Sequence, residues 1–336
     1  MARVPLTIAT WDYDRVRPLI DGRVRIEGCD INFIRVELEE CFHRAWYHQE
    51  FDVTEIGLSG YYVAVSRGTG QPFGVSPYVA LPVFLSRSFR ANGIYVRSDR
   101  GLEKPADLRG RKIGVPEYQI TAAVWARGFL ADEYGVHVDD CIWYQGGMDD
   151  PGRQDKWPNN LPQGFPLNFL GAGATLNAMF EAGDLDAMIC PRMPRAMHRP
   201  GAPVRRLFPD YEAVEKDYFA RTGIFPIMHP IGLRRELHEK HPWLAANVYQ
   251  AFSEAKRLSQ QDLFETAALK IGLPWLVSSA ESARALFGND IFPYGYANAL
   301  PTLNAMSRYM VDQHIAVRHV GPEELFPASV MSDWKT

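Results

Sequence analysis

Short apolar runs alternate with amphipathic segments over the first third of the chain. Runs rich in β-branched and aromatic residues predict strands at 6–10, 30–36 and 51–56, with an amphipathic helix at 38–49 between the last two. Ser59 is then a candidate cap for a helix that ends at Gly68. Strand and helix in alternation are typical of an α/β fold with a parallel sheet.

A second α/β unit begins near Arg97. Its pattern predicts strands at 111–116, 142–145, 186–190 and 204–208, and a helix at 121–133. The segment 146–173 is rich in Gly, Pro, Asn and Asp and is too long for a simple connection inside a compact domain. We therefore expect this segment to be a binding loop or a lid.

The apolar run 225–233 leads back to the first unit, and helical patterns follow at 243–259 and 300–313. We expect a discontinuous first lobe made of 1–95 and 225–336, with a second lobe, 96–224, inserted in it. The chain would cross between the lobes near 85–96 and near 222–229. Two lobes joined by two hinge strands would enclose a central cleft.

Composition and charge exclude several classes of protein. With 336 residues, 46% of them hydrophobic, the chain is long enough for about two domains with large cores. Its 36 Lys and Arg against 40 Asp and Glu leave a net charge of -4, so we expect no nucleic-acid partner. The four cysteines lack metal-binding spacing and are expected to be buried thiols in a reducing compartment.

Neither a signal peptide nor a membrane span is indicated. One positive charge and a short apolar stretch precede Asp12, which leaves no room for a signal-peptide core. The longest charge-free stretch, 68–86, carries three prolines, so it is better read as a loop followed by a buried strand. We therefore expect a cytoplasmic protein with no membrane partner.

Polar residues that follow the predicted strands are candidates for a ligand site, because open α/β sheets bind ligands outside the carboxyl ends of their strands. The candidate segments are 10–13, 55–59, 86–90, 116–121, 191–192 and 228–229. They are expected to meet at one cleft.

Five side chains in these segments have suitable chemistry. Arg87, Arg90 and Arg192 could hold carboxylates in bidentate pairs, although an isolated arginine is more often a solvated surface residue. His229 lies in an apolar run and is either a core histidine or a proton-transfer group. Glu55, at the end of a buried strand, is either paired with an arginine or functionally placed.

The turn 116–121 is the most informative local signal. A strand, a polar turn and a helix capped by Thr121 would point backbone N–H groups at an anion, and Tyr118 could stack on a planar ligand. The alternative is an ordinary helix cap with Glu117 and Tyr118 at the surface. The chain carries no phosphate-binding loop, dinucleotide fingerprint, serine-hydrolase elbow or zinc-protease motif.

Six segments stand in a characteristic order over nearly the whole chain. They are EFDVTE (50–55), LPVFLSRSFR (81–90), DLRGRKIGVPEY (107–118), TAAVWARG (121–128), GDLDAMICPR (183–192) and RTGIFPIMH (221–229). Together they resemble the 4,5-dihydroxyphthalate decarboxylase family. The resemblance implies an α/β, two-lobed fold like that of type 2 periplasmic binding proteins, with a central cleft and two hinge strands.

The chain departs from the pattern expected of this family. After Arg90, where a His followed by small polar residues is expected, the segment Ala91–Gly93 stands instead. Gly57 and Ala45 occupy places where Ser and Met are expected. If the absent His touches substrate, this chain acts on a related aromatic acid or has lost the reaction.

The resemblance implies non-oxidative decarboxylation of a hydroxylated phthalate-type dicarboxylic acid, giving 3,4-dihydroxybenzoate and CO2 from 4,5-dihydroxyphthalate. Arg87, Arg90 and Arg192 would then bind carboxylates, while His229 and either Glu117 or Glu55 would move protons. Tyr118, Thr121, Ser59 and Trp11 complete the expected substrate-binding set. We expect no organic cofactor; a divalent metal could chelate a catechol, but the sequence shows no ligand cluster for one.

Two other functions compete with this one. A non-catalytic protein of the same fold could bind a small anion, although the missing signal peptide argues against transport. An enzyme that makes a cofactor precursor, as pyrimidine-synthase relatives do, would need His and Cys motifs that are absent here. The aromatic segments 143–144 and 292–296 leave room for a homo-oligomer.

Overall fold

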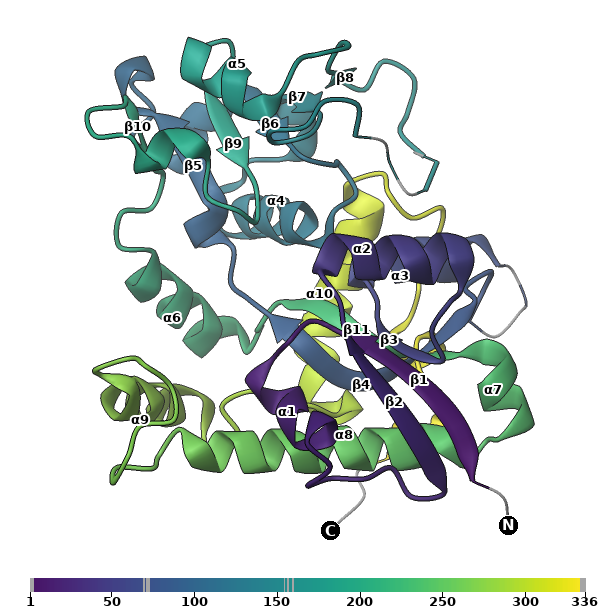
Figure 1. Ribbon diagram of the computed structural model, residues 1–336. Coiled ribbons are helices and arrows are strands. Elements are labelled where there is room, and N and C mark those ends of the chain that lie inside the picture. The colour runs from purple at the N-terminus through teal and green to yellow at the C-terminus, as the bar shows by residue number, and fades with distance from the viewer. Residues whose placement is uncertain are drawn as a thin grey trace. The chain divides into compact units, whose positions relative to one another are not determined.

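The computed structural model describes residues 3–68, 70, 73–153, 155, 157–158 and 160–332. The chain divides into two compact units, each with its own sheet and helices (Figure 1). The first unit comprises Met1–Arg87, Ile227–Leu303 and Val320–Thr336, and the second comprises Ser88–Pro226 and Asn304–His319.

The first unit is built on a five-stranded sheet with the order β2-β1-β3-β11-β4. Its strands are β1 (Val4–Thr10), β2 (Cys29–Arg35), β3 (Val53–Glu55), β4 (Tyr78–Arg87) and β11 (Ile227–Arg234). β1 runs parallel to β2 and β3, whereas β11 runs antiparallel to both β3 and β4. The carboxyl ends of β1, β3 and β4 therefore lie at the same edge of the sheet as the amino end of β11.

Several helices of the first unit pack against this sheet. The helices of the unit include α1 (Arg17–Ile20), α2 (Leu38–His43), α3 (Leu58–Arg67), α7 (Arg235–Lys240), α8 (Leu244–Asp262) and α9 (Leu276–Phe287). Of these, α2, α3, α7 and α8 pack against the strands of the sheet. Nearly all of α3 is buried, its Ser59 and Ser66 included. α8, the long green helix in Figure 1, buries one face and exposes the other. α10 (Tyr296–Asp312) contributes residues to both units.

The second unit contains a six-stranded sheet with the order β10-β5-β9-β6-β7-β8. Its strands are β5 (Ile94–Arg97), β6 (Lys112–Val115), β7 (Ile142–Gln145), β8 (Leu167–Phe169), β9 (Ala187–Ile189) and β10 (Val204–Arg206), and its helices include α4 (Thr121–Tyr134), α5 (Leu176–Ala182) and α6 (Tyr211–Thr222). β9, β6, β7 and β8 are parallel, and β5 is antiparallel to β9.

The end of α10 packs against α4 in the core of the second unit. A Cβ atom on Gly128 would lie 2.3 Å from the ring of Tyr309, so the two helices approach each other closely at this glycine. The Arg127 guanidinium lies 3.9 Å from the Tyr118 ring centroid and donates a 2.8 Å hydrogen bond to Gln313. These contacts explain why 304–319 belongs to the second unit, whereas the sequence assigned it to the first.

The second unit also begins earlier than expected, at Ser88 rather than residue 96, and ends at Pro226 before the return along Asn304–His319. Each predicted strand has a counterpart in the structure, displaced by a few residues at most. The helix predicted at 38–49 is α-helical only to His43 and continues as a π-helical turn, Arg44–His48.

Two predicted helix caps are wrong. Gly57 is the N-cap of α3 and Ile120 is the N-cap of α4, and neither makes a side-chain capping bond. Ser59 and Thr121 instead lie inside the first turns of these helices, where both are buried. Extended backbone at the preceding residue starts each helix without a capping side chain.

Expectations about the cysteines, the charge-free stretch, the aromatic segments and membrane spans can be compared with the structure. All four cysteines are free and buried, as predicted. β4 is the buried strand predicted after the charge-free loop, although Pro72 in that loop lies outside the described residues. Trp143 and Tyr294 are buried, whereas Tyr144, Phe292 and Tyr296 of the same two segments are partly exposed, and a homo-oligomer stays a prediction. None of the described helices is both long and apolar enough to cross a membrane.

Candidate functional site

Three strands of the first sheet bring a carboxylate and a histidine together. β3 pairs with β1 through Ala9 and Thr54, and with β11 through Glu55 and Ile231. Glu55 at the end of β3 therefore lies between the residues that follow β1 and those that begin β11. His229 is one of these β11 residues, and it pairs across the sheet with Ser86 of β4.

The Glu55 carboxylate is fully buried and accepts hydrogen bonds from three donors. Oε1 lies 2.5 Å from the Tyr13 hydroxyl and 2.7 Å from Nδ1 of His229. Oε2 accepts a 3.2 Å bond from the backbone N–H of Trp11. A buried carboxylate needs such partners, because burial without them is costly.

His229 has one ring nitrogen held and the other available. A carboxylate can only accept, so Nδ1 is the donor toward Glu55. Among the described residues, none forms a hydrogen bond with Nε2 of His229, and the side chain is 15% exposed. The Phe42 ring packs edge-on against the imidazole with centroids 4.8 Å apart. The arrangement presents Nε2 as an atom that can give or take a proton.

Tyr13 completes this cluster. Burial, together with the charge of Glu55, raises the pKa of Tyr13 well above its ordinary value, so the hydroxyl stays protonated and donates. The Arg15 guanidinium lies 4.1 Å from the Tyr13 ring centroid. Sequence reasoning named the segment 10–13 but did not select Tyr13, because its link to Glu55 spans 42 residues and leaves no local pattern.

Arg87 and Ser59 are the two other candidates of the first unit. Arg87 ends β4, is 7% exposed and lies 4.8 Å from the Phe84 ring centroid. Burial lowers the pKa of Arg87 to about 9, against the opposing charge of Asp290, so the guanidinium remains a cation at neutral pH. Ser59 is buried in α3.

Strand ends of the second sheet gather a separate set of polar groups. Glu117 follows β6, is 4% exposed, and its Oε2 lies 3.4 Å from Nη2 of Arg153. Gln145 ends β7 and donates a 2.9 Å bond to Asp155. The described residues of the predicted binding loop therefore contact the carboxyl ends of β6 and β7.

Tyr118 lies in the interior of the second unit and not at a surface. It is fully buried, with the Arg127 guanidinium over its ring and its hydroxyl donating to the Gln313 carbonyl at 3.3 Å. Because protein atoms already occupy its surroundings, we remove Tyr118 from the residues proposed to contact substrate. Thr121 is buried at the start of α4 and stays a predicted site residue.

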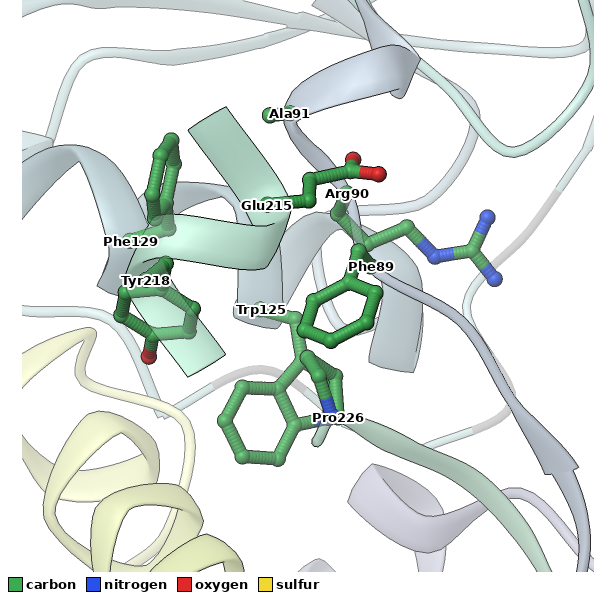
Figure 2. A pocket seen from close by; sticks show the side chains of 8 residues that line it. All are labelled: Phe89, Arg90, Ala91, Trp125, Phe129, Glu215, Tyr218 and Pro226. Carbon is green, nitrogen blue, oxygen red and sulfur yellow. The ribbon is translucent and has the colours of Figure 1, made fainter. Parts of the chain in front are cut away.

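Arg90 and Arg192 have different environments. Burial lowers the pKa of Arg90 to about 10, an effect that the nearby charge of Glu215 opposes. Arg90 lines a cavity of about 10 Å³ together with aromatic residues and Glu215 (Figure 2). Arg192 follows β9 and is exposed.

Among the described residues, no group of three or more His, Cys, Asp or Glu side chains is placed to hold a metal ion.

The chain is similar to curated proteins over its whole length. It is 41% identical over 336 residues to the 4,5-dihydroxyphthalate decarboxylase of Comamonas testosteroni, covering 99% of both chains. It belongs to the 4,5-dihydroxyphthalate decarboxylase family. A second member, from Pseudomonas putida, is 42% identical over 219 residues, which are 65% of this chain and 83% of that one. No protein-family model matches the chain.

Solved structures identify the fold of this decarboxylase-family chain. The aliphatic sulphonate-binding protein SsuA of Escherichia coli is 15% identical with a TM-score of 0.54, covering 96% of this chain and 97% of that one. A mutant of DszB in complex with biphenyl-2-sulfinic acid is also 15% identical, with a TM-score of 0.52 and 97% of each chain covered. The predicted periplasmic-binding-protein-like α/β fold is confirmed.

Proposed function

We propose that this chain is a carboxy-lyase that converts 4,5-dihydroxyphthalate to 3,4-dihydroxybenzoate and CO2. The observation that carries the proposal is the 41% identity with the Comamonas testosteroni relative of that name, over 99% of both chains. The cluster of Glu55, His229 and Tyr13 supports it, because it supplies the proton-transfer chemistry that such a reaction needs.

The substrate supplies the electrons for its own decarboxylation. Each carboxylate of 4,5-dihydroxyphthalate stands para to a hydroxyl group, which donates electron density to the ring carbon that bears the carboxylate. That carbon takes a proton, the bond to the carboxyl carbon breaks, and its electron pair returns to the ring as CO2 leaves. One proton is consumed for each CO2 released, so the enzyme must deliver a proton and be reprotonated from solvent.

We assign the proton delivery to Nε2 of His229. Glu55 holds Nδ1 and stabilises the charged imidazole that precedes delivery. We choose Glu55 over Glu117 as the partner carboxylate because Glu55 is bonded to His229, whereas Glu117 is paired with Arg153. Trp11 contributes through its backbone N–H, which donates to Glu55.

Arginines remain our proposal for holding the two substrate carboxylates. Arg87 is buried and Arg90 is partly buried, and their lowered pKa values still lie well above neutral pH. A guanidinium at a partly desolvated position pairs strongly with a carboxylate. Arg192 is an exposed third candidate.

The test is an assay on purified protein in the absence of added cofactor. We expect loss of 4,5-dihydroxyphthalate with release of 3,4-dihydroxybenzoate and CO2 in equal amounts, at a rate that a chelator leaves unchanged. Tight binding without product would support a non-catalytic binding protein and refute the proposed activity. We also expect the protein to act in the cytoplasm, which cell fractionation would test.

A further inference from the structure

A buried glutamate is hydrogen-bonded to the turn that follows Arg90. Ala91–Gly93 forms a single 3-10 turn, and Glu215 of α6 accepts a 3.0 Å hydrogen bond from the backbone N–H of Asn92. The N–H of Ala91 also donates to this carboxylate. Glu215 is 8% exposed, so its charge is largely removed from water and depends on these donors.

Further bonds fix the same turn from its other sides. Nε of Arg206 donates to the Asn92 carbonyl at 3.2 Å, and the N–H of Cys190 donates to the Gly93 carbonyl at 3.1 Å. A Cβ atom on Gly93 would lie 3.0 Å from the Cys190 carbonyl oxygen, so the turn lies close against the chain that follows β9. Glu215 is the acidic partner in this set of contacts.

The cavity beside Glu215 is too small for an aromatic acid. It encloses about 10 Å³, room for about one water molecule, and Trp125, Phe129 and Tyr218 contribute its aromatic lining. In Figure 2 the Glu215 carboxylate and the Arg90 guanidinium point to the same side, away from the rings of Phe129 and Tyr218. Glu215 therefore acts through the backbone that carries Arg90 and not by enclosing a substrate in this cavity.

We propose that Glu215 is a positioning residue for Arg90: by holding the turn Ala91–Gly93, it fixes the guanidinium that binds a substrate carboxylate. The inference rests on the proposed function, which gives Arg90 that role. Loss of the Glu215 charge then weakens substrate binding and leaves the chemical step unchanged.

The charge of Glu215 is sensitive to pH in the physiological range. Burial raises its pKa to about 7, while the N–H of Asn92 and the charges of Arg90 and Arg206 act in the opposite direction. The other titratable groups that line the cavity are the Arg90 guanidinium and the Tyr218 phenol, and α4 contributes the rings of Trp125 and Phe129. Glu215 is ionised above pH 7 and protonated below it, so it holds the turn best above pH 7.

The test compares Glu215→Gln with Glu212→Gln, an exposed glutamate one turn earlier on α6 that pairs with Lys216. At pH 8 we expect E215Q to raise KM for 4,5-dihydroxyphthalate about tenfold, with kcat within about twofold of wild type. The KM ratio of E215Q to wild type should fall toward one at pH 6, because wild-type Glu215 is then protonated. E212Q should match wild type at both pH values.

Phthalate serves as a probe that does not react, since it has both carboxylates and no hydroxyl group. Its Kd, measured by titration calorimetry, should rise in E215Q and in Arg90→Ala. The double variant should bind no more weakly than R90A alone, because both changes act through one guanidinium. Glu215→Asp, which keeps the charge but shortens the reach, should also weaken phthalate binding at pH 8.

Three results would overturn the inference: E215Q and E212Q with equal KM and Kd at pH 8, additive effects of R90A and E215Q, or a loss of kcat without a change in KM. These outcomes are separable from failure of the proposed function. Wild-type protein that binds phthalate through Arg90 and Glu215 but forms no 3,4-dihydroxybenzoate would refute the activity and retain the positioning role. Wild-type protein that binds neither compound would refute both.

Discussion

Replacing Glu215 by Gln removes a buried charge, so it should change how the stability of the protein depends on pH. The pKa of Glu215 is about 7 in the folded protein, raised by burial from its ordinary value of 4.5. Between pH 4.5 and pH 7, the folded state therefore keeps a proton that the unfolded state has already released. For a carboxyl group shifted in this direction, stability falls as the pH rises from 4.5 through 7.

The magnitude follows from the two pKa values. The difference between about 7 and 4.5, at about 1.36 kcal/mol for each pH unit, is about 3 kcal/mol. Integrated over the two titrations, about 2.5 kcal/mol of this difference develops between pH 5 and pH 8. Wild type should lose this much free energy of unfolding relative to E215Q over that range, because Gln has no charge to bury.

Urea unfolding at pH 5, 6, 7 and 8 measures the difference directly. Titration of all other groups is shared by wild type and E215Q, so it cancels when their free energies of unfolding are subtracted. E212Q, which alters an exposed side chain, should follow wild type within about 0.5 kcal/mol. Parallel curves for wild type and E215Q would refute the claim that Glu215 carries a buried charge.

Three more predictions concern single side chains. Tyr13→Phe should lower kcat about tenfold with little change in KM, because Glu55 loses one of the three donors that orient its carboxylate. Steady-state kinetics measure both constants, and a change in KM alone would contradict the prediction. Gly128→Ala should lose about 1–3 kcal/mol of unfolding free energy, since its Cβ would lie 2.3 Å from the Tyr309 ring. Gly171→Ala, with nothing within 4 Å, is the matched control, and equal Tm values for the two would count against the packing argument. Arg192→Ala should raise KM without changing Tm, because the side chain is exposed; unchanged kinetics would remove it from the site.

Strands could be predicted from the sequence where an apolar run is short and bounded by turn residues, and this includes the partly exposed β2 and β10. β7 occupies the residues predicted for it, and β4 is buried along nearly its whole length. The first residues of the helices were harder to predict from the sequence. Gly57 and Ile120 are N-caps by their backbone conformation alone, and neither makes a side-chain capping bond that the residue type would indicate. The end of α10 joins the second unit through Tyr309 and Gln313, contacts that no local pattern reveals.

The candidate site was predictable where chemistry and strand ends coincide. Glu55 and His229 are polar groups in apolar runs, and the structure joins them at 2.7 Å. Tyr118 was misjudged because a tyrosine in a polar turn gives no sign of whether its ring faces inward. Glu215 could not be predicted as a site residue, because the sequence of α6 does not distinguish it from the exposed Glu212. Only tertiary packing buries one glutamate and leaves the other exposed.

The most direct measurement is the rate of 3,4-dihydroxybenzoate formation from 4,5-dihydroxyphthalate by wild type and by His229→Asn, a variant that keeps a polar side chain but cannot deliver a proton from Nε2. We predict that wild type forms product and CO2 in equal amounts and that H229N is slower by about 10²–10⁴ in kcat, the usual contribution of a positioned acid. Equal rates for the two proteins, or no product from wild type, would contradict the account.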